Sequence, residues 1–566
     1  MLGNSSLDRE SRPIRRVLVF ARLLVVVFSV GLLGLLARVG QLQVRPSEPL
    51  VRLVDRQHSK RAIHARRGNI VDARGRMLAT SQVSTRLFVD PKLIHDPVRF
   101  ARIVGDVLEY EPGQVVKHIR DRPEGRFVVI DHHLSDGRID ELTQLKMRGL
   151  GTQPWMMRRY PQGSHAGQLL GVVGFEGPGW EGLELLYNDE LSGRSGSLSY
   201  QVDVQRRGLW ARDYRAARDG QTIRLTIDLV VQSIAESHLE RQCIQYGAEH
   251  GQIIVMEPRR GHVLAMANYP FYDPNHLPGS NPDQRRNQCV TDAFEPGSVF
   301  KPFIWSMATE LGIGDRQEVI DCTASGVYRS PEGRRLRDVR GHGRLTWDEV
   351  LIKSSNIGMA IVGQRLGARR IYDTVRTFGF GAPTGSGLPG ESPGIVRPAK
   401  QWNHYSVTSV PMGQEIAVTG LQLVRALAAI ANDGLMPVPT IRARDPGDVP
   451  RIYERILSAH TARVTRQVMR RVVTEGTGRK ANSDLYTMFG KTGTAQVPDP
   501  EHKKYFDDQY VASFISGAPL HEPRLVVGCF IHRPDKEKGY YGGIVAAPAV
   551  RRVIEESLVY MGVARQ

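Results

Sequence analysis

Cysteine is scarce in this chain, with four among 566 residues. Cys243, Cys289, Cys322 and Cys529 lie far apart and form no C-x-x-C pair, which argues against a disulfide-dense scaffold and a structural zinc site. One or two disulfides are compatible with the spacing. No cluster of His, Cys and carboxylate residues has metal-ligand spacing, so we expect no metal and no cofactor.

Long runs of like charge are also missing. The chain has 76 Lys and Arg against 59 Asp and Glu, and its net charge is +17. The basic residues are scattered as singles and pairs, so we expect no nucleic acid partner; a basic surface facing polyanionic envelope material would have the same composition. The 41% of hydrophobic residues excludes a wholly disordered chain, and the length leaves room for several folded units.

Only one long apolar run is present, at residues 17–37, and Arg22 is its only charge. This run can cross a bilayer core. Arginines precede it, and basic residues mark the cytoplasmic flank of a membrane helix. We therefore predict a cytoplasmic tail at 1–16, an uncleaved single-pass anchor at 17–43 and an extracytoplasmic remainder. The alternative is a cleaved signal peptide, but residues 37–41 lack a small-x-small cleavage site.

The composition and the hydrophobic pattern of the remaining chain change near Gln221. Residues 44–221 are rich in Arg and Gly with short β-branched runs, which predicts an irregular β-rich pedestal of short strands and few helices. Residues 222–566 have the pattern of a compact α+β domain. We expect strands at 222–227, 251–256, 510–517 and 525–532, and helices at 229–246, 419–432 and 547–561.

An S-x-x-K motif occurs at residues 298–301, directly after Pro296 and Gly297. Ser298 and Lys301 are one helical turn apart and share a face. A serine becomes a good nucleophile when a base takes its proton, and lysine is such a base when burial or a nearby cation lowers its pKa. Alone, the motif equally fits a serine at a helix start and a solvated lysine.

Two further motifs follow in order. Ser354, Ser355 and Asn356 form S-x-N, in which Ser354 can relay a proton and Asn356 can hold a substrate amide. Residues 491–494 form K-T-G-T. There Lys491, Thr492 and Thr494 can bind a carboxylate, and Gly493 lets a substrate backbone pass close to an edge strand. Each motif alone fits an ordinary polar loop or strand end.

The ordered trio resembles that of penicillin-binding proteins and serine β-lactamases, and most of the chain resembles a class B penicillin-binding protein, a monofunctional peptidoglycan transpeptidase. Residues 67–79 resemble the family's N-terminal signature, and residues 174–184 resemble its linking region with an insertion. Residues 294–298 and 542–548 match the transpeptidase core. The resemblance implies a five-stranded antiparallel sheet flanked by helices.

The resemblance also implies a mechanism. Ser298 would attack the carbonyl between the last two D-alanines of a peptidoglycan stem peptide, with Lys301 as base, and an amine of a second stem peptide would resolve the acyl-enzyme. The backbone amides of Ser298 and Thr494 would form the oxyanion hole, and β-lactams would acylate Ser298. No glycosyltransferase domain is visible, so we expect a membrane glycosyltransferase and division proteins as partners.

Within class B, residues 354–356 resemble the division type, since the elongation type usually has Asp at the third position of this motif. Residues 412–419 resemble the division type or the sporulation relatives. We therefore expect septal cell-wall synthesis at the cytoplasmic (inner) membrane. An elongation or sporulation transpeptidase, a β-lactam-hydrolysing or sensing relative and a non-catalytic division scaffold stay open.

Three further residues have weaker interpretations. Tyr540 and Tyr541 are a possible aromatic pocket wall, and packing on the last strand explains them nearly as well. His342 fits loop structure better than catalysis. We also expect Lys491 to keep Lys301 deprotonated by like-charge repulsion.

Overall fold

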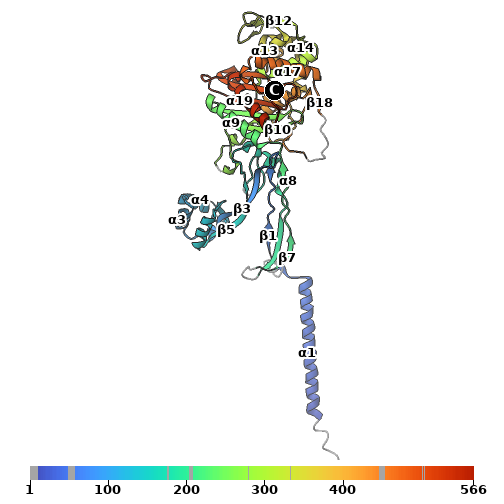
Figure 1. The fold of residues 1–566 in the computed structure, drawn as a ribbon. Coiled ribbons are helices and arrows are strands. Elements are labelled where there is room, and N and C mark those ends of the chain that lie inside the picture. The colour runs from blue at the N-terminus through green and yellow to red at the C-terminus, as the bar shows by residue number, and fades with distance from the viewer. Residues whose placement is uncertain are drawn as a thin grey trace, which may run out of the picture. The chain divides into compact units, whose positions relative to one another are not determined.

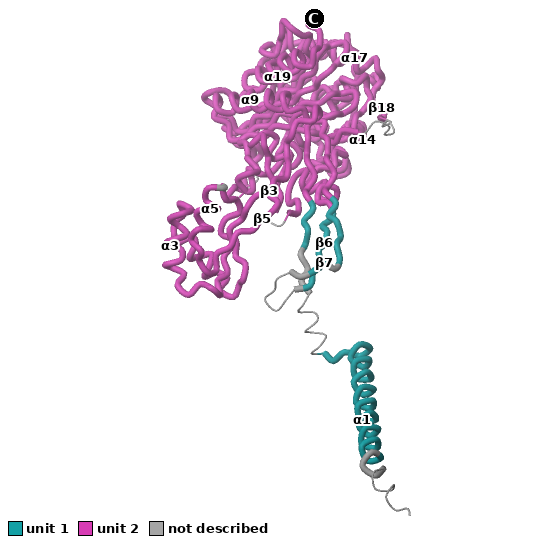
Figure 2. The backbone as a smooth tube through the Cα atoms, turned by 60° about the horizontal axis from the view of Figure 1, so that its bottom comes forward, with its two compact units in different colours: residues 1–65, 194–218 teal, residues 66–193, 219–566 magenta. Residues whose placement is uncertain are grey.

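The computed structural model describes residues 11–48, 58–174, 177–202, 208–277, 279–331, 333–444, 453–499, 501–502 and 504–566. Phe175 and Glu176, in the predicted linking region, and the first ten residues of the predicted cytoplasmic tail lie outside these ranges. The chain forms two compact units, residues 1–65 with 194–218 and residues 66–193 with 219–566 (Figure 2). The division into a pedestal at 44–221 and a catalytic domain at 222–566 stays a prediction.

The first unit contains the apolar helix and a small sheet. Helix α1 (Ser11–Val44) includes a 30-residue stretch from Arg15 with a mean hydropathy of 2.5 in its most apolar window and exposed side chains. Its length and composition fit a single-pass membrane helix. The antiparallel sheet has the order β1 (His58–Ile63), β6 (Gly196–Val202), β7 (Gly208–Arg215).

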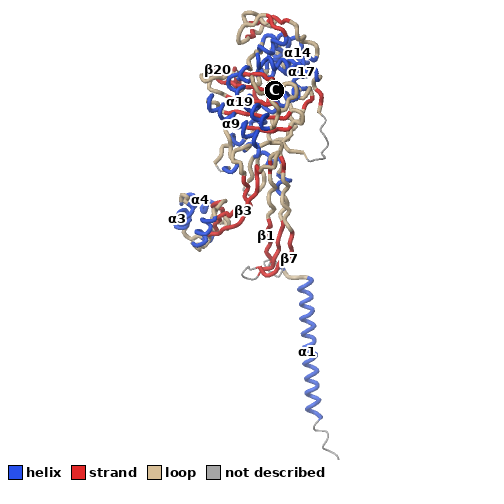
Figure 3. Tube along the Cα trace, viewed as in Figure 1, coloured by secondary structure: helices blue, strands red, loops and turns tan. Residues whose placement is uncertain are grey.

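A five-stranded antiparallel sheet forms the centre of the second unit, which confirms the expected α+β fold (Figure 3). Its order is β10 (His262–Tyr269), β9 (His250–Glu257), β21 (Leu525–His532), β20 (Lys504–Ala518), β19 (Phe489–Asp499). Strand β19, which carries the K-T-G-T motif, is therefore an edge strand of this sheet.

Helices cover both faces of the sheet because its strands are apolar on both sides. Ile253 and Val255 of β9 pack into one core with α9 (Leu229–Tyr246) and α19 (Ala547–Tyr560) (Figure 1). Their neighbours Ile254 and Met256 face the opposite core, which includes α16 (Gly420–Ala431). This alternation follows from the two-residue period of a strand.

Local capping sets the helix ends. Helix α9 begins after the Asp228 cap, whose side chain accepts a hydrogen bond from the Val230 amide, and ends at Gly247 with a φ of 57°. Helix α16 has a capping box in which Thr419 and Gln422 exchange hydrogen bonds. The predicted bounds 229–246 are those observed, and the predicted 419–432 corresponds to α16 with its two caps.

One longer helix, α17, and several short elements also belong to the second unit. They are α6 (Gly167–Leu170), α7 (Gly182–Leu186), α8 (Asn188–Ser192), α10 (Pro282–Arg285), α11 (Gln288–Thr291), β12 (Val319–Asp321), β13 (Val327–Arg329), β15 (Arg344–Thr346), α15 (Ser406–Ser409), β16 (Val418–Thr419), β17 (Leu435–Met436), β18 (Glu454–Arg455), α17 (Ala459–Thr474) and α18 (Gly542–Val545). The four cysteines are buried and unpaired.

The N-terminal part of the second unit is more helical than expected. Its sheet has the order β4 (Val128–Asp131), β3 (Met77–Val89), β2 (Ile70–Val71), β8 (Ile223–Arg224), and β5 (Leu150–Arg159) pairs with β3. Helices α3 (Pro97–Leu108), α4 (Pro112–Asp121) and α5 (Asp136–Gln144) accompany these strands. The expectation of few helices is wrong because Phe100, Val104 and Leu108 recur at helical spacing and form a separate buried core with β3.

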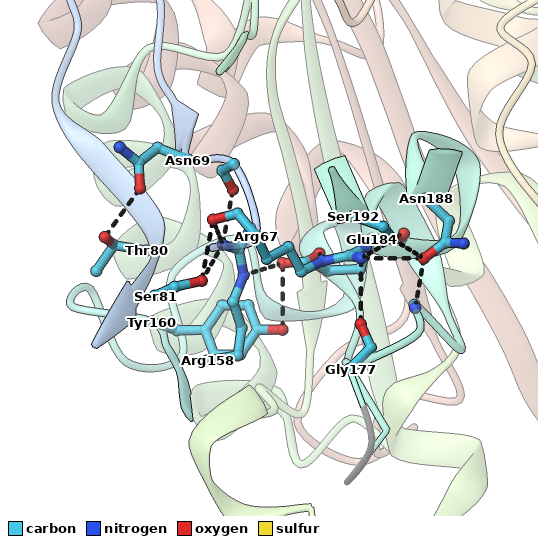
Figure 4. Close-up of polar contacts among 12 residues, drawn as sticks. Arg67, Asn69, Thr80, Ser81, Arg158, Tyr160, Gly177, Glu184, Asn188 and Ser192 are labelled. Carbon is cyan, nitrogen blue, oxygen red and sulfur yellow. Dashed lines mark hydrogen bonds and ion pairs between the residues drawn. The ribbon is translucent and has the colours of Figure 1, made fainter. Parts of the chain in front are cut away.

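A buried ion cluster fixes this part of the chain (Figure 4). The fully buried carboxylate of Glu184 accepts hydrogen bonds from Arg67 Nε and Arg158 Nε, each at 2.6 Å. Arg67 also donates to the Glu184 carbonyl at 2.6 Å, and Arg158 donates to the Gly68 carbonyl at 2.7 Å. The cluster therefore joins the 67–68 segment, β5 and α7.

We expect Glu184→Gln to lower the free energy of unfolding of the second unit by about 3–5 kcal/mol, because it leaves two buried guanidinium groups without their carboxylate. Urea unfolding followed by fluorescence measures the change. Glu318→Gln is the control, since it breaks a more exposed pair with Arg365 and should cost less than about 1 kcal/mol. Equal losses in the two variants would contradict the assignment of the cluster as a structural centre.

Candidate active site

Ser298 lies in a tight turn between β11 (Ala293–Phe294) and α12 (Lys301–Glu310). Gly297 has a φ of 55°, which a glycine adopts without strain, and its amide donates to the Gly413 carbonyl at 3.0 Å. A 3₁₀ turn at Gly297–Phe300 then leads into the helix. Ser298 is partly exposed, and its hydroxyl has no hydrogen-bond partner among the described residues.

The second motif is a junction between two helices. Helix α13 (Trp347–Lys353) ends at Ser354, whose φ is 61°, and α14 (Asn356–Thr377) begins after its cap, Ser355. Lys301 Nζ donates to the Ser354 carbonyl and to Asn356 Oδ1, each at 2.7 Å, and lies 3.3 Å from Ser354 Oγ. The junction thus presents several oxygen atoms to one amine.

The third motif adds a second amine to this group. Lys491 Nζ on β19 donates to Ser354 Oγ at 2.8 Å and to the Thr492 carbonyl at 3.0 Å. The hydroxyl of Ser354 therefore lies between the two lysine amines. Four of the predicted residues form one hydrogen-bonded cluster: Lys301, Ser354, Asn356 and Lys491.

Burial controls the charge of both lysines. Each has no exposed surface, and neither contacts a carboxylate among the described residues. Burial lowers the pKa of Lys301 to about 7, against an opposing effect of the Asp338 charge. Burial, together with the charge of Lys301, holds the pKa of Lys491 well below its usual value. A neutral Lys301 amine is therefore available near neutral pH as a proton acceptor.

Both causes named from the sequence, burial and a nearby cation, are present in this site. Burial is the larger cause of the low pKa of Lys301, and the charges of Lys301 and Lys491 disfavour each other.

The other residues of the third motif have separate contacts. The hydroxyls of Thr492 and Thr477 are 2.6 Å apart, and Thr494 Oγ1 accepts a hydrogen bond from the Gly542 amide at 3.1 Å. A Cβ atom on Gly493 would lie 2.8 Å from Val299 Cγ1, so the glycine allows β19 to pack against the turn of Ser298. Its expected contact with a substrate backbone stays a prediction.

Tyr540 and Tyr541 lie beside the third motif through this Gly542 contact. Their rings stack with centroids 4.4 Å apart, and Tyr540 packs at the same distance against Tyr510 of β20. Tyr541 is 41% exposed. Packing on β20 thus accounts for Tyr540, while Tyr541 has the exposure that a pocket wall needs.

Sequence reasoning missed two residues that contact the motifs. Asp338, just after β14 (Arg335–Arg337), accepts hydrogen bonds from Ser355 Oγ and the Asn356 amide. Thr477, in the loop after α17, bonds to Thr492. Asp338 lies in an arginine-rich stretch without a motif, and Thr477 is a single threonine between two glycines, so neither had a sequence signal of its own.

Comparison with known proteins identifies the family of this chain. Residues 251–555 match the penicillin binding protein transpeptidase domain, and residues 62–225 match the penicillin-binding protein dimerisation domain. A probable peptidoglycan D,D-transpeptidase, PbpC of Pseudomonas aeruginosa, is 32% identical over 95% of this chain and 94% of its own length. Stage V sporulation protein D of Bacillus subtilis is 32% identical over 97% of this chain and 86% of its own.

Solved structures have the same fold. The crystal structure of penicillin binding protein 3 from Mycobacterium tuberculosis, complexed with aztreonam, has a TM-score of 0.69 and 29% identity, over 89% of this chain and 98% of that one. The chain therefore belongs to the penicillin-binding protein family and is a peptidoglycan D,D-transpeptidase of the class B type.

Proposed function

We propose that this chain crosslinks stem peptides in septal peptidoglycan, with Ser298 as nucleophile and Lys301 as general base. The observation that carries the catalytic part is the buried amine of Lys301, which lies one helical turn after Ser298 and has a pKa lowered to about 7. A base whose pKa is near the working pH is both deprotonated and strong enough to take the serine proton.

In this mechanism Ser298 Oγ attacks the carbonyl carbon of the bond between the two terminal D-alanines, and its proton moves to Lys301 Nζ. The tetrahedral intermediate collapses to an ester on Ser298, and D-alanine leaves with a proton. Ser354 Oγ, 3.3 Å from Lys301 Nζ and 2.8 Å from Lys491 Nζ, supports the proposed proton relay. An amine of a second stem peptide then attacks the ester and restores the free serine.

The edge position of β19 supports the proposed substrate contacts. An edge strand has backbone amides without a neighbouring strand, so the Thr494 amide can join the Ser298 amide in an oxyanion hole. Lys491, Thr492 and Thr494 are the proposed carboxylate site, and Gly493 keeps this strand close to Ser298. The aztreonam complex of the Mycobacterium tuberculosis relative supports the proposal that β-lactams bind this chain, and Ser298 is the proposed site of their acylation.

Helix α1 supports a location in the cytoplasmic (inner) membrane, with residues 1–16 inside and the catalytic domain outside. A membrane glycosyltransferase and division proteins are the proposed partners, because the resemblance assigns polymerisation of the glycan to another protein. The septal role depends on the S-S-N form of the second motif. A sporulation role is the second candidate, because the Bacillus subtilis relative matches over 97% of this chain.

We expect Ser298→Ala to abolish labelling of the detergent-solubilised full chain by a fluorescent penicillin. Lys301→Ala should lower the acylation rate by about 10²–10⁴, the usual contribution of a general base. In the parent the rate should fall as the pH drops below about 7, because Lys301 becomes protonated. Lys400→Ala, which removes an exposed lysine, is the control and should label like the parent. Near-parental acylation of the Lys301 variant would rule it out as the base.

The septal assignment has a cellular test. Depleting the protein in its own host should give filaments without septa, because side-wall growth continues while division stops. Microscopy with a fluorescent D-amino acid reports where crosslinking is lost. Rounded cells would indicate an elongation role instead, and normal growth with defective spores would indicate the sporulation role. A plasmid copy with Ser298→Ala should fail to rescue division, whereas the Lys400→Ala copy should rescue it.

A further inference from the structure

Asp338 accepts three hydrogen bonds from the second motif and the residue after it, although no sequence motif includes Asp338. Its Oδ2 accepts a hydrogen bond from Ser355 Oγ at 2.6 Å, and its Oδ1 accepts from the amides of Asn356 and Ile357 at 2.5 and 3.2 Å. These amides belong to the first turn of α14, where backbone donors lack partners within the helix. A carboxylate at this end of a helix is also favoured by the helix dipole.

The same segment fixes the orientation of the Asn356 side chain. Asn356 Nδ2 donates to the carbonyl of Arg337, the residue before Asp338, at 2.9 Å. An amide has its donor and acceptor on opposite sides, so this bond turns Oδ1 toward Lys301, whose Nζ lies 2.7 Å away. The Asp338 amide in turn donates to the Gly326 carbonyl at 3.0 Å. Residues 337–338 therefore hold the backbone and the side chain of Asn356 together.

Charge connects Asp338 to the base as well. Lys301 is buried, and the negative charge of Asp338 favours its ammonium form, against the effect of burial. The other amine in the cluster is Lys491. The charge of Asp338 also affects two other titratable groups, His342 and Cys322. The charges of Arg340 and Lys353 act on His342, and the charge of Asp321 acts on Cys322.

We propose that Asp338 is a positioning residue for acylation: it aligns Asn356 with Lys301, and it holds its carboxylate beside the residue that contacts the base. The inference rests on the proposed roles of Ser298 and Lys301. Asp338 makes no hydrogen bond to Ser298 among the described residues, so it acts through the second motif.

The test is the pH dependence of acylation of the full chain by a fluorescent penicillin, across the pH range in which the protein stays folded. Asp338→Asn removes the charge that favours protonated Lys301, so the midpoint of the acidic limb should move to lower pH by about one unit. The maximal rate should also fall, because the amide of Asn cannot accept all three hydrogen bonds. Asp321→Asn removes a neighbouring exposed charge and should leave the midpoint in place.

Asp338→Glu separates charge from placement. It keeps the carboxylate on a longer side chain, so it should retain the parental midpoint while its maximal rate falls. Asp338→Glu also tests the proposal if Asp338→Asn does not fold. A midpoint of the acidic limb that moves to lower pH in Asp338→Glu, where the charge is present, would overturn the proposal.

Two further results would overturn it. One is an unchanged midpoint in Asp338→Asn with only a lower maximal rate, which is the behaviour of a purely structural helix cap. The other is an equal displacement in Asp321→Asn. Failure of the proposed function is a separate result, because the parent would then show no labelling at Ser298 or no acidic limb to displace.

Discussion

The amines of Lys301 and Lys491 are both buried against Ser354, and this shared burial is the constraint on which the chemistry of the site depends. An ammonium group loses its hydration when it is buried, and in this site no contacting carboxylate among the described residues replaces that hydration. The neutral form is therefore favoured, which lowers the pKa of Lys301 to about 7. Oxygen atoms of Ser354 and Asn356 hold the amine in place without neutralising it.

The fold makes that burial possible by bringing three separate chain segments within hydrogen-bond distance. The turn at Gly297 packs closely against Gly413. A Cβ atom on Gly413 would lie 2.2 Å from the Gly297 carbonyl oxygen. Gly493 allows β19 to approach Val299, where a Cβ atom would lie 2.8 Å from Val299 Cγ1. These contacts hold the turn that precedes Lys301 against β19, the strand that carries Lys491. The Glu184 ion cluster, elsewhere in this unit, is also buried, but there the carboxylate contacts two guanidinium groups of opposite charge.

The sequence predicted those parts of the molecule whose signals are local. Helix α9 has the expected bounds because its cap, its apolar residues and Gly247 all lie within one segment. The motif residues were found because their spacing is characteristic. The motifs did not show that Lys301 and Lys491 are both fully buried, since burial depends on residues distant in the chain. Asp338 was missed for the same reason: its role exists only because the loop after β14 folds back onto Ser355. Helix α3 was missed although Asp96 and its apolar spacing were visible in the sequence.

The most direct test of this account is the protonation of Lys301 itself. Lysine carrying an isotopic label at its ε carbon can be incorporated into the full chain and followed by NMR during a pH titration. One resonance, absent from the spectrum of Lys301→Ala, should change from the protonated to the neutral shift with a midpoint of about 7. A Lys301 resonance that stays protonated well into alkaline pH would contradict the claim that burial makes this lysine the base.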